Sequence, residues 1–322
     1  MTTRRFLLRP GFVVLLLIAV GCGSESETPV NPNPTPSTTP QYVLKWGTPG
    51  TGISQFSAPS GVAVDISGNV YVTDSNNHRI QKFSGSGGYL TQWGSVGGND
   101  GEFNFPVGIA VADVGHVYVV DQNGHRVQKF DVAGGYITQW GTVGAGAGEF
   151  NYPAGIAFDE TDEQLYVADE GNDRIQVFDS NGGFVTQWGS TGTGDGEFDS
   201  PWGVAVDASG NVYVTDSGNN RIQKFNGSGS FLAKWGTPGT GDGQFDFPWG
   251  VAVDKSGNVY VTERTIDSSR IQKFSSAGVF ITKWGSWGDA NGQFAAPEGI
   301  AIDSNGNIFI AEEYNNRIQK FR

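Results

Sequence analysis

Short segments rich in β-branched and aromatic residues recur along most of the chain, and turns of Gly, Asn, Asp and Ser separate them. The first complete unit holds four such segments, at 61–65, 70–74, 79–83 and 89–93. β-Branched and aromatic residues favour strands, while Gly and Asn favour the tight turns of antiparallel hairpins. The pattern therefore predicts one four-stranded antiparallel sheet for each unit.

The unit occurs six times, and a Trp-Gly pair marks the end of each fourth predicted strand. The tryptophans are Trp46, Trp93, Trp140, Trp188, Trp235 and Trp284, at intervals of 47 to 49 residues. A period of this length is typical of propellers and solenoids. No segment has the apolar periodicity of a helix, which excludes the helical repeat folds.

The two ends of the repeat region predict that the units close into a ring. The last unit, 297–322, holds only three predicted strands and ends with 317–321. The missing fourth strand is found at the other end of the repeat region, at 42–46. Closure by this strand removes the sheet edge that a linear array would expose. Residues 41–322 therefore predict an all-β, six-bladed β-propeller of four-stranded antiparallel blades, closed by the N-terminal strand.

Three motifs of the unit resemble the NHL repeat. They are Pro-x-Gly-(Ile/Val)-Ala-Val-Asp, Gly-Asn-Val-Tyr-Val-Thr-Asp and Asn-x-Arg-Ile-Gln-Lys-Phe. The resemblance covers 41–322 and implies a six-bladed propeller. The family includes ligand- and protein-binding domains, the RNA-binding ends of tripartite-motif ubiquitin ligases, and the peptide-amidating lyase. Because these functions differ widely, the motif indicates the fold and leaves the function open.

Residues 1–22 are predicted to be a lipoprotein-type signal peptide. Three arginines precede an apolar run at 12–20 that is too short to span a bilayer. Ala19-Val20-Gly21-Cys22 resembles a bacterial lipobox, in which the cysteine is lipidated, and Cys22 is the only cysteine of the chain. An ordinary secretory peptide with an incidental cysteine is the alternative.

Residues 23–40 are rich in Ser, Thr, Asn and Pro and have no apolar pattern, which predicts a disordered tether. The chain is therefore expected to be exported to a bacterial cell envelope and lipid-anchored at the outer membrane or the cell surface. It would contact the membrane only through its N-terminal lipid. A secreted or periplasmic protein is the alternative.

The charge of the chain argues against a nucleic-acid partner. It has 20 basic and 33 acidic residues and a formal net charge of −13. Removal of the signal peptide takes away three arginines and no acid, so the mature chain has 17 basic and 33 acidic residues, a net charge of −16. A protein of this charge repels a phosphate polyanion.

Each unit carries an acid at the end of its second predicted strand and an arginine at the start of its third. The acids are Asp74, Asp121, Asp169, Asp216, Glu263 and Glu312, and the arginines are Arg79, Arg126, Arg174, Arg221, Arg270 and Arg317. Repetition in every unit indicates a structural role, since one site needs only one copy. As exposed cross-strand pairs they are expected to contribute about 0–1 kcal/mol each and to fix the turn.

A phenylalanine also recurs in each unit, within the loop that precedes the first strand. These residues are Phe56, Phe103, Phe150, Phe198, Phe245 and Phe294. They and the six repeated tryptophans are expected to pack in the core or between blades.

The loops that join successive blades carry acids and no Lys or Arg. The acids are Asp100, Glu102, Glu149, Asp195, Glu197, Asp199, Asp242, Asp246, Asp289 and Glu298. These loops and the loops between second and third strands are expected at the same end of the propeller. The acidic rim either keeps the protein soluble or receives a cationic or neutral ligand.

Departures from the repeat predict a ligand-binding site where blades 4 and 5 meet. Trp202 and Trp249 occupy the same position in neighbouring units, between the Pro and Gly that open the first strand. The strand-two-to-three loop of blade 5, 264–269, is two residues longer than its counterparts. The predicted site comprises Trp202, Trp249, Asp199, Asp246, Glu298 and Phe247. Aromatic rings beside acids suit a sugar, a peptide side chain or a cation. The alternative is that these rings only pack against the next blade.

The residues point to binding more than to catalysis. The histidines His78 and His125 are predicted on one face and His116 on the other, so they cannot form a three-histidine zinc site. No catalytic residue, metal ligand or cofactor is therefore assigned, although a divalent cation such as calcium is left open. The favoured function is an extracytoplasmic binding or scaffold module, monomeric, for a protein, peptide or glycan. The alternative is a metal-dependent hydrolase or lyase with a carboxylate-lined central channel, as in lactonases or the amidating lyase.

Overall fold

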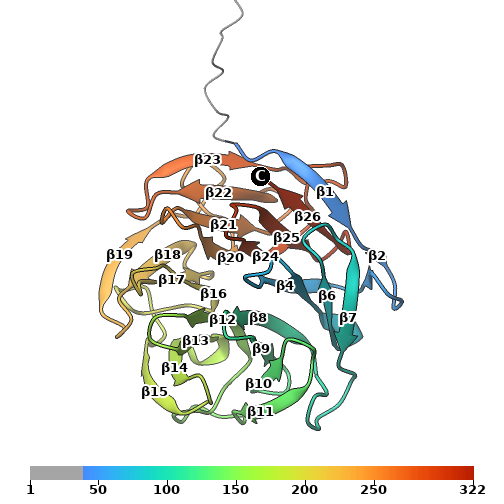
Figure 1. Ribbon diagram of the computed structural model, residues 1–322. Helices are drawn as coiled ribbons and strands as arrows, with labels where there is room; N and C mark the ends of the chain where they lie inside the picture. The colour runs from blue at the N-terminus through green and yellow to red at the C-terminus, as the bar shows by residue number, and fades with distance from the viewer. Residues whose placement is uncertain (1–38) are drawn as a thin grey trace, which may run out of the picture. The chain divides into compact units, whose positions relative to one another are not determined.

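Six four-stranded antiparallel sheets surround a central axis in the computed structural model, which describes residues 39–322 (Figure 1). Blade 1 consists of β4 (Pro59–Val64), β5 (Val70–Asp74), β6 (Arg79–Phe83) and β7 (Tyr89–Trp93). These bounds agree with the four strands predicted from the sequence, except that β4 begins two residues earlier and ends one residue earlier than predicted. The signal peptide, Cys22 and most of the tether lie outside the described residues.

The other blades repeat this order from the channel outward. Blade 2 has β8 (Pro106–Ala112), β9 (His116–Asp121), β10 (Arg126–Asp131) and β11 (Tyr136–Trp140), and blade 3 has β12 (Pro153–Asp159), β13 (Gln164–Asp169), β14 (Arg174–Asp179) and β15 (Phe184–Trp188). Blade 4 has β16 (Pro201–Val206), β17 (Val212–Asp216), β18 (Arg221–Phe225) and β19 (Phe231–Trp235), and blade 5 has β20 (Pro248–Val253), β21 (Val259–Glu263), β22 (Arg270–Phe274) and β23 (Phe280–Trp284). Blade 6 has β24 (Pro297–Ile302), β25 (Ile308–Glu312), β26 (Arg317–Phe321) and β1 (Tyr42–Trp46).

Minor elements lie in the loops. Strands β2 (Thr48–Pro49) and β3 (Gln55–Phe56) form a two-residue parallel pair in the loop that enters blade 1. The helical segments among residues 39–322 are two 3₁₀ turns, η1 (Ser75–Asn77) and η2 (Glu170–Asn172). No helix in this described range is long and apolar enough to cross a membrane.

The N-terminal strand closes the ring, as the sequence predicts. Figure 1 shows β1 beside β26, next to the C-terminus. The two strands pair antiparallel, with Tyr42 opposite Phe321 and Trp46 opposite Ile318. The backbones of Gln41 and Arg322 exchange two hydrogen bonds, of 2.8 and 2.9 Å. Blade 6 is therefore built from both ends of the propeller.

The core lies between neighbouring blades, because the inner strands of each blade are covered on both faces by the blades beside them. All five residues of β5 are buried, whereas the outer strand β7 alternates between half-buried and exposed positions. The six repeated phenylalanines are fully buried, which confirms their predicted core role. At one contact between neighbouring blades, Phe103 and Trp93 pack against Phe130 with ring centroids 5.6 and 5.8 Å apart.

The glycine of each Trp-Gly pair makes this packing possible. Gly94 has φ +100°, a conformation that residues with a side chain rarely adopt. A Cβ atom there would lie 2.7 Å from the Phe103 ring and 2.9 Å from the carbonyl oxygen of His78. Each Trp-Gly pair thus joins an aromatic side chain to a backbone turn at which there is no space for a side chain.

The repeated acid–arginine pairs are buried, so the expectation that they are exposed is wrong. In blade 2, Arg126 Nε donates to Asp121 Oδ2 at 2.8 Å, and both residues are buried. The same guanidinium donates to the carbonyl oxygens of Gly98 and Glu102, at 2.9 and 2.7 Å. The loop that enters the blade folds over the pair and excludes water. Each arginine therefore ties that loop to its blade, which is a larger structural role than fixing one turn.

Candidate ligand-binding site at the channel mouth

The loops that join successive blades and the loops between second and third strands lie at the same end of the propeller, as expected. The backbone N–H of Asn123, in the strand-two-to-three loop of blade 2, donates to the carbonyl of Asn104 in the loop that enters this blade. We call this end the top face. It is the face on which the predicted site residues lie.

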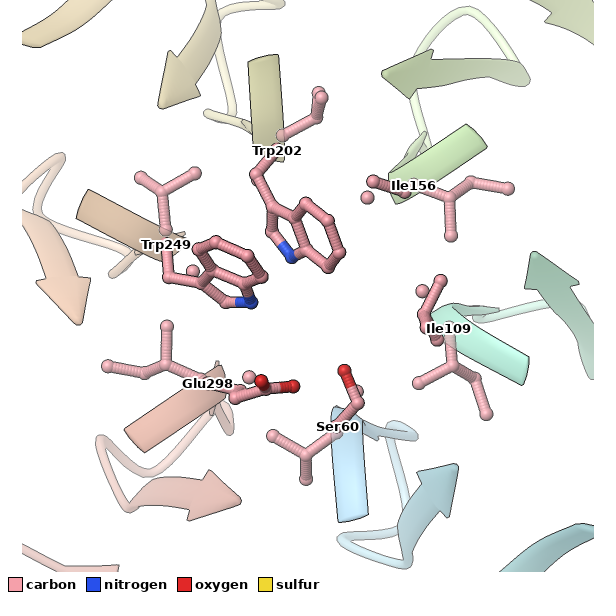
Figure 2. Close-up of a pocket in the computed structure, with 18 residues that line it drawn as sticks. Ser60, Ile109, Ile156, Trp202, Trp249 and Glu298 are labelled. Atoms are coloured by element: carbon pink, nitrogen blue, oxygen red, sulfur yellow. The ribbon is translucent and has the colours of Figure 1, made fainter. Parts of the chain in front are cut away.

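The first ring of side chains at the mouth follows the proline that opens the first strand of each blade. Its members are Ser60, Val107, Ala154, Trp202, Trp249 and Glu298, and all six line the central channel. Figure 2 shows Ser60, Trp202, Trp249 and Glu298 pointing inward from four different blades. Glu298 is the one carboxylate among the residues that line this channel.

A second ring follows the acid at the end of each second strand. Its members are Ser75, Gln122, Glu170, Ser217, Arg264 and Glu313. The two serines bind this second ring to the first strand of the next blade, because Ser75 Oγ donates to the carbonyl of Pro106 at 2.7 Å and Ser217 Oγ to that of Pro248 at 2.6 Å. The charged members of this ring lie in blades 3, 5 and 6.

Trp202 and Trp249 stack on one another. Their ring centroids are 3.8 Å apart and their planes meet at 30°. In Figure 2 both indole nitrogens face the middle of the channel. The buried Nε1 of Trp249 has no hydrogen-bond partner. The structure thus brings the two predicted tryptophans together, but as one stacked pair that covers part of the mouth and not as two separate rings.

Arg264, from the long loop of blade 5, occupies the mouth beside this pair. Its guanidinium carbon lies 4.3 Å from the Trp249 ring centroid, the geometry of a cation–π contact. Its Nη1 lies 3.0 Å from Glu298 Oε1, and its Nη2 donates to Glu313. One arginine therefore holds two carboxyl groups of blade 6. The inter-blade loops contain no positive charge, but this neighbouring loop supplies one.

Two carboxyl groups of the mouth have raised pKa values. Burial raises the pKa of Glu298 to about 8; Arg264 opposes the rise, and Glu313 adds to it. Burial and the nearby Asp173 raise the pKa of Glu170 to about 7. Near neutral pH Glu298 keeps its proton and Glu170 is partly protonated, so the mouth is less negative than the count of acids suggests.

The other predicted acids, Asp199 and Asp246, are absent from the lining of the channel mouth and of a second cavity beside it. Asp199 is exposed at the rim and accepts a hydrogen bond from Ser200 Oγ at 3.2 Å. Asp246 accepts one from Thr265 Oγ1 at 2.5 Å. Of the ten acids predicted for this rim, several already bind other groups of the protein. Glu102, Glu149 and Glu197 accept backbone N–H groups of their own loops, and Asp195 and Asp242 pair with lysines of the outer strands.

A second cavity, of about 460 Å³, opens on the top face between blades 5 and 6; we call it the side pocket. Its lining is Phe247, Trp249, Arg264, Thr265, Ile266, Trp287 and Tyr314. Only Phe247 and Trp249 belong to the predicted site, which lacks Arg264, Thr265, Ile266, Trp287 and Tyr314. The sequence contains a signal for two of them. Trp287 stands where the other units have Pro49, Val96, Val143, Thr191 and Pro238, and Tyr314 stands where four of them have Asn76, Asn123, Gly171 and Gly218.

The histidines of the top face hold loops. Nδ1 of His78 accepts the backbone N–H of Phe105, and Nδ1 of His125 accepts that of Tyr152, both at 3.2 Å. Across residues 39–322, no group of three or more His, Cys, Asp or Glu side chains is placed to hold a metal ion.

Six stretches of the chain match the NHL repeat. They are 56–83, 103–130, 150–178, 198–225, 245–274 and 294–321, one for each blade. The chain belongs to the NHL-repeat family. Each stretch runs from the buried loop phenylalanine to the end of the third strand, so the family pattern spans the acid–arginine pair of its blade.

One curated relative matches a short stretch of the chain. A 46-residue stretch of this NHL protein is 50% identical to the B-box type zinc finger protein ncl-1 of Caenorhabditis elegans. That stretch is 14% of this chain and 5% of the length of the relative. The chain therefore spans only a small part of the length of this relative.

Solved structures share the NHL propeller's fold at low identity. A protein of unknown function from Bacteroides thetaiotaomicron has a TM-score of 0.67 at 22% identity, over 86% of this chain and 74% of that one. A gluconolactonase from Xanthomonas campestris has 0.61 at 15%, over 84% and 87%. Virginiamycin B lyase from Staphylococcus aureus has 0.59 at 18%, over 82% and 94%. At these identities the likeness establishes the fold alone.

Proposed function

We propose that this NHL propeller is a binding or scaffold module that receives a protein, peptide or glycan on the top face of blades 4 to 6. The observation that carries the proposal is the gathering of aromatic rings there. Phe247, Trp287 and Tyr314 are 46%, 38% and 58% exposed and line one cavity with Trp249. Clusters of exposed aromatic side chains are typical of binding sites and are uncommon elsewhere on a protein surface.

The proposal includes the location of the module. The N-terminal signal pattern and Cys22 support export to a bacterial cell envelope and anchoring by a lipid. In that setting the propeller would present its top face to an extracytoplasmic partner, as a monomer.

The stacked tryptophans provide the first test. Glycan and peptide arrays probed with the purified protein should identify a ligand, and the double variant Trp202→Ala, Trp249→Ala should bind it about thirtyfold more weakly, the usual effect of removing an aromatic anchor. Because both rings are partly buried, binding is measured well below the melting temperature of the variant. A folded variant that binds with the affinity of the wild type would remove the stacked pair from the site.

A hydrolase or lyase remains the second candidate function, and Glu298 is the observation that favours it. This buried carboxyl group faces the channel beside Ser60 and, with a pKa of about 8, can give up or accept a proton near neutral pH. A divalent metal would find one carboxylate in the channel lining, and Arg264 already holds it. The geometry therefore favours acid–base chemistry over the metal-dependent form. Turnover of a lactone panel that is lost in Glu298→Gln would support this candidate; no turnover by the wild type would count against it.

A further inference from the structure

We propose that the side pocket binds an aromatic side chain of a polypeptide partner, within a segment whose flanking residues are basic. This inference rests on the proposed function, because it names the class of ligand and its position on the same face. It follows from the shape of the pocket, from the hydrogen bonds already made by its lining, and from the charges at its rim.

The shape suits an inserted ring. Phe247, Ile266, Trp287 and Tyr314 come from four different loops, while Trp249 and Arg264 complete the lining. The rings of Trp287 and Tyr314 stand edge to face, with centroids 6.1 Å apart and planes at 69°. They therefore form angled walls, not a flat platform for a sugar. The volume of about 460 Å³ lies within the range of about 300–1,000 Å³ that is common for ligand pockets.

The polar side chains of Arg264 and Thr265 in the lining are already engaged, and the unpartnered indole nitrogen of Trp249 faces the central channel. Both terminal nitrogens of Arg264 contact carboxyl groups of blade 6. The hydroxyl of Thr265 donates to Asp246. A sugar ring buried here would lose the water around its hydroxyl groups and find few partners, which costs free energy for each unsatisfied group. An aromatic side chain has no such requirement on all its edges, and Tyr314 is itself 58% exposed.

The charges of the rim indicate the flanking residues. Three wall residues are each next to an acid in the sequence: Phe247 follows Asp246, Ile266 precedes Asp267, and Tyr314 follows Glu313. Arg264 is the one cation of the lining, and the carboxylate of Glu313 pairs with it, which leaves the negative charges of Asp246 and Asp267 at the rim. The whole chain has a net charge of −13. Lys or Arg on both sides of the inserted ring would therefore be attracted to this rim.

The test is a random peptide display library selected against the purified protein. The selected peptides should share an aromatic residue flanked by Lys or Arg. For a synthetic peptide of the consensus sequence, replacement of its aromatic residue by Ala should abolish binding, and replacement of its basic residues by Glu should weaken it about tenfold or more. Higher salt should weaken binding of the original peptide.

Variants of the protein locate the site. Trp287→Ala and Tyr314→Ala should each weaken binding of the consensus peptide about tenfold or more. Tyr152→Ala is the matched control, because Tyr152 is a 49% exposed ring on the top face in the loop that enters blade 3. It should bind like the wild type. Trp287→Phe, which keeps a ring, should retain most of the affinity, and an unchanged melting temperature of Trp287→Ala would show that its loss of affinity does not come from misfolding.

Several outcomes would overturn the inference. They are a library without enriched peptides, a consensus without an aromatic residue or with acidic flanks, and peptide binding that Trp287→Ala and Tyr314→Ala leave unchanged. If glycans bind instead and Trp287→Ala weakens them, the proposed function stands and this inference fails. If neither peptides nor glycans bind, both fail.

Discussion

A chain that begins at residue 48 should lose about 6 kcal/mol or more of its unfolding free energy, whereas a chain that begins at Thr39 should keep the stability of the full protein. The shorter chain lacks β1 and therefore both Trp46 and Tyr42. The ring centroid of Trp46 lies 5.8 Å from that of Phe83 and 6.3 Å from that of Phe309, and Tyr42 packs against Phe321. Tyr42 and Trp46 are half-buried, so removal of each costs somewhat less than the ~3–5 kcal/mol of a fully buried aromatic side chain, and the lost pairing with β26 adds to that cost. The expected loss is comparable to the whole stability of a typical domain, about 5–15 kcal/mol.

Urea unfolding and size-exclusion chromatography measure this effect. The chain without β1 should also aggregate, because the exposed edge of β26 offers an unpaired strand. A synthetic peptide of residues 39–47 added in excess should restore part of the lost stability, since it can occupy the vacant position. Equal midpoints for the two chains would contradict closure by the N-terminal strand.

Arg126→Met should lower the unfolding free energy by about 3–5 kcal/mol, far more than the loss of an exposed ion pair. The substitution leaves the buried carboxylate of Asp121 without its cation and removes the hydrogen bonds to the loop that enters blade 2. The double variant Asp121→Asn, Arg126→Met should recover part of the loss, because no buried charge remains.

The pH dependence of the Arg126→Met variant has a defined sign. Burial already raises the pKa of Asp121, while Arg126 opposes the rise. Without the arginine the folded protein holds the proton of Asp121 more tightly than the unfolded chain does, so stability falls as pH increases above the ordinary pKa of an aspartate. Urea unfolding at pH 4 and pH 8 should show the larger deficit at pH 8. A loss of unfolding free energy below about 1 kcal/mol at both pH 4 and pH 8 would show that the pair contributes no more than an exposed ion pair.

The fold was predictable because the repeat constrains it at every position. The intervals between Trp-Gly pairs give one blade per unit, and the half units at 42–46 and 317–321 can be completed only by pairing with each other. The burial of the acid–arginine pairs was not predictable from the same pattern. It depends on the path of each inter-blade loop, which folds back over the pair at a distance of more than twenty residues in the sequence.

The candidate site was predictable only in part. The equivalent positions of Trp202 and Trp249 place them on neighbouring blades, but their stacking and the insertion of Arg264 depend on side-chain conformations and on the course of the long loop. The raised pKa of Glu298 could not be predicted from the sequence, because it results from the burial of the side chain in the fold. Trp287 and Tyr314 could have been found by comparing every position of the repeat, since both replace smaller residues.

Two phenylalanines of similar exposure allow the most direct test of the proposed binding face. Phe247 lies in the side pocket and is 46% exposed, whereas Phe184 lies on the outer strand of blade 3 and is 41% exposed. The measurement is the affinity of the strongest ligand from the peptide and glycan arrays for Phe247→Ala, with Phe184→Ala as the control. We expect Phe247→Ala to bind about tenfold more weakly and Phe184→Ala to bind like the wild type. Unchanged binding by Phe247→Ala, or a greater loss in Phe184→Ala, would contradict a binding site on the top face of blades 4 to 6.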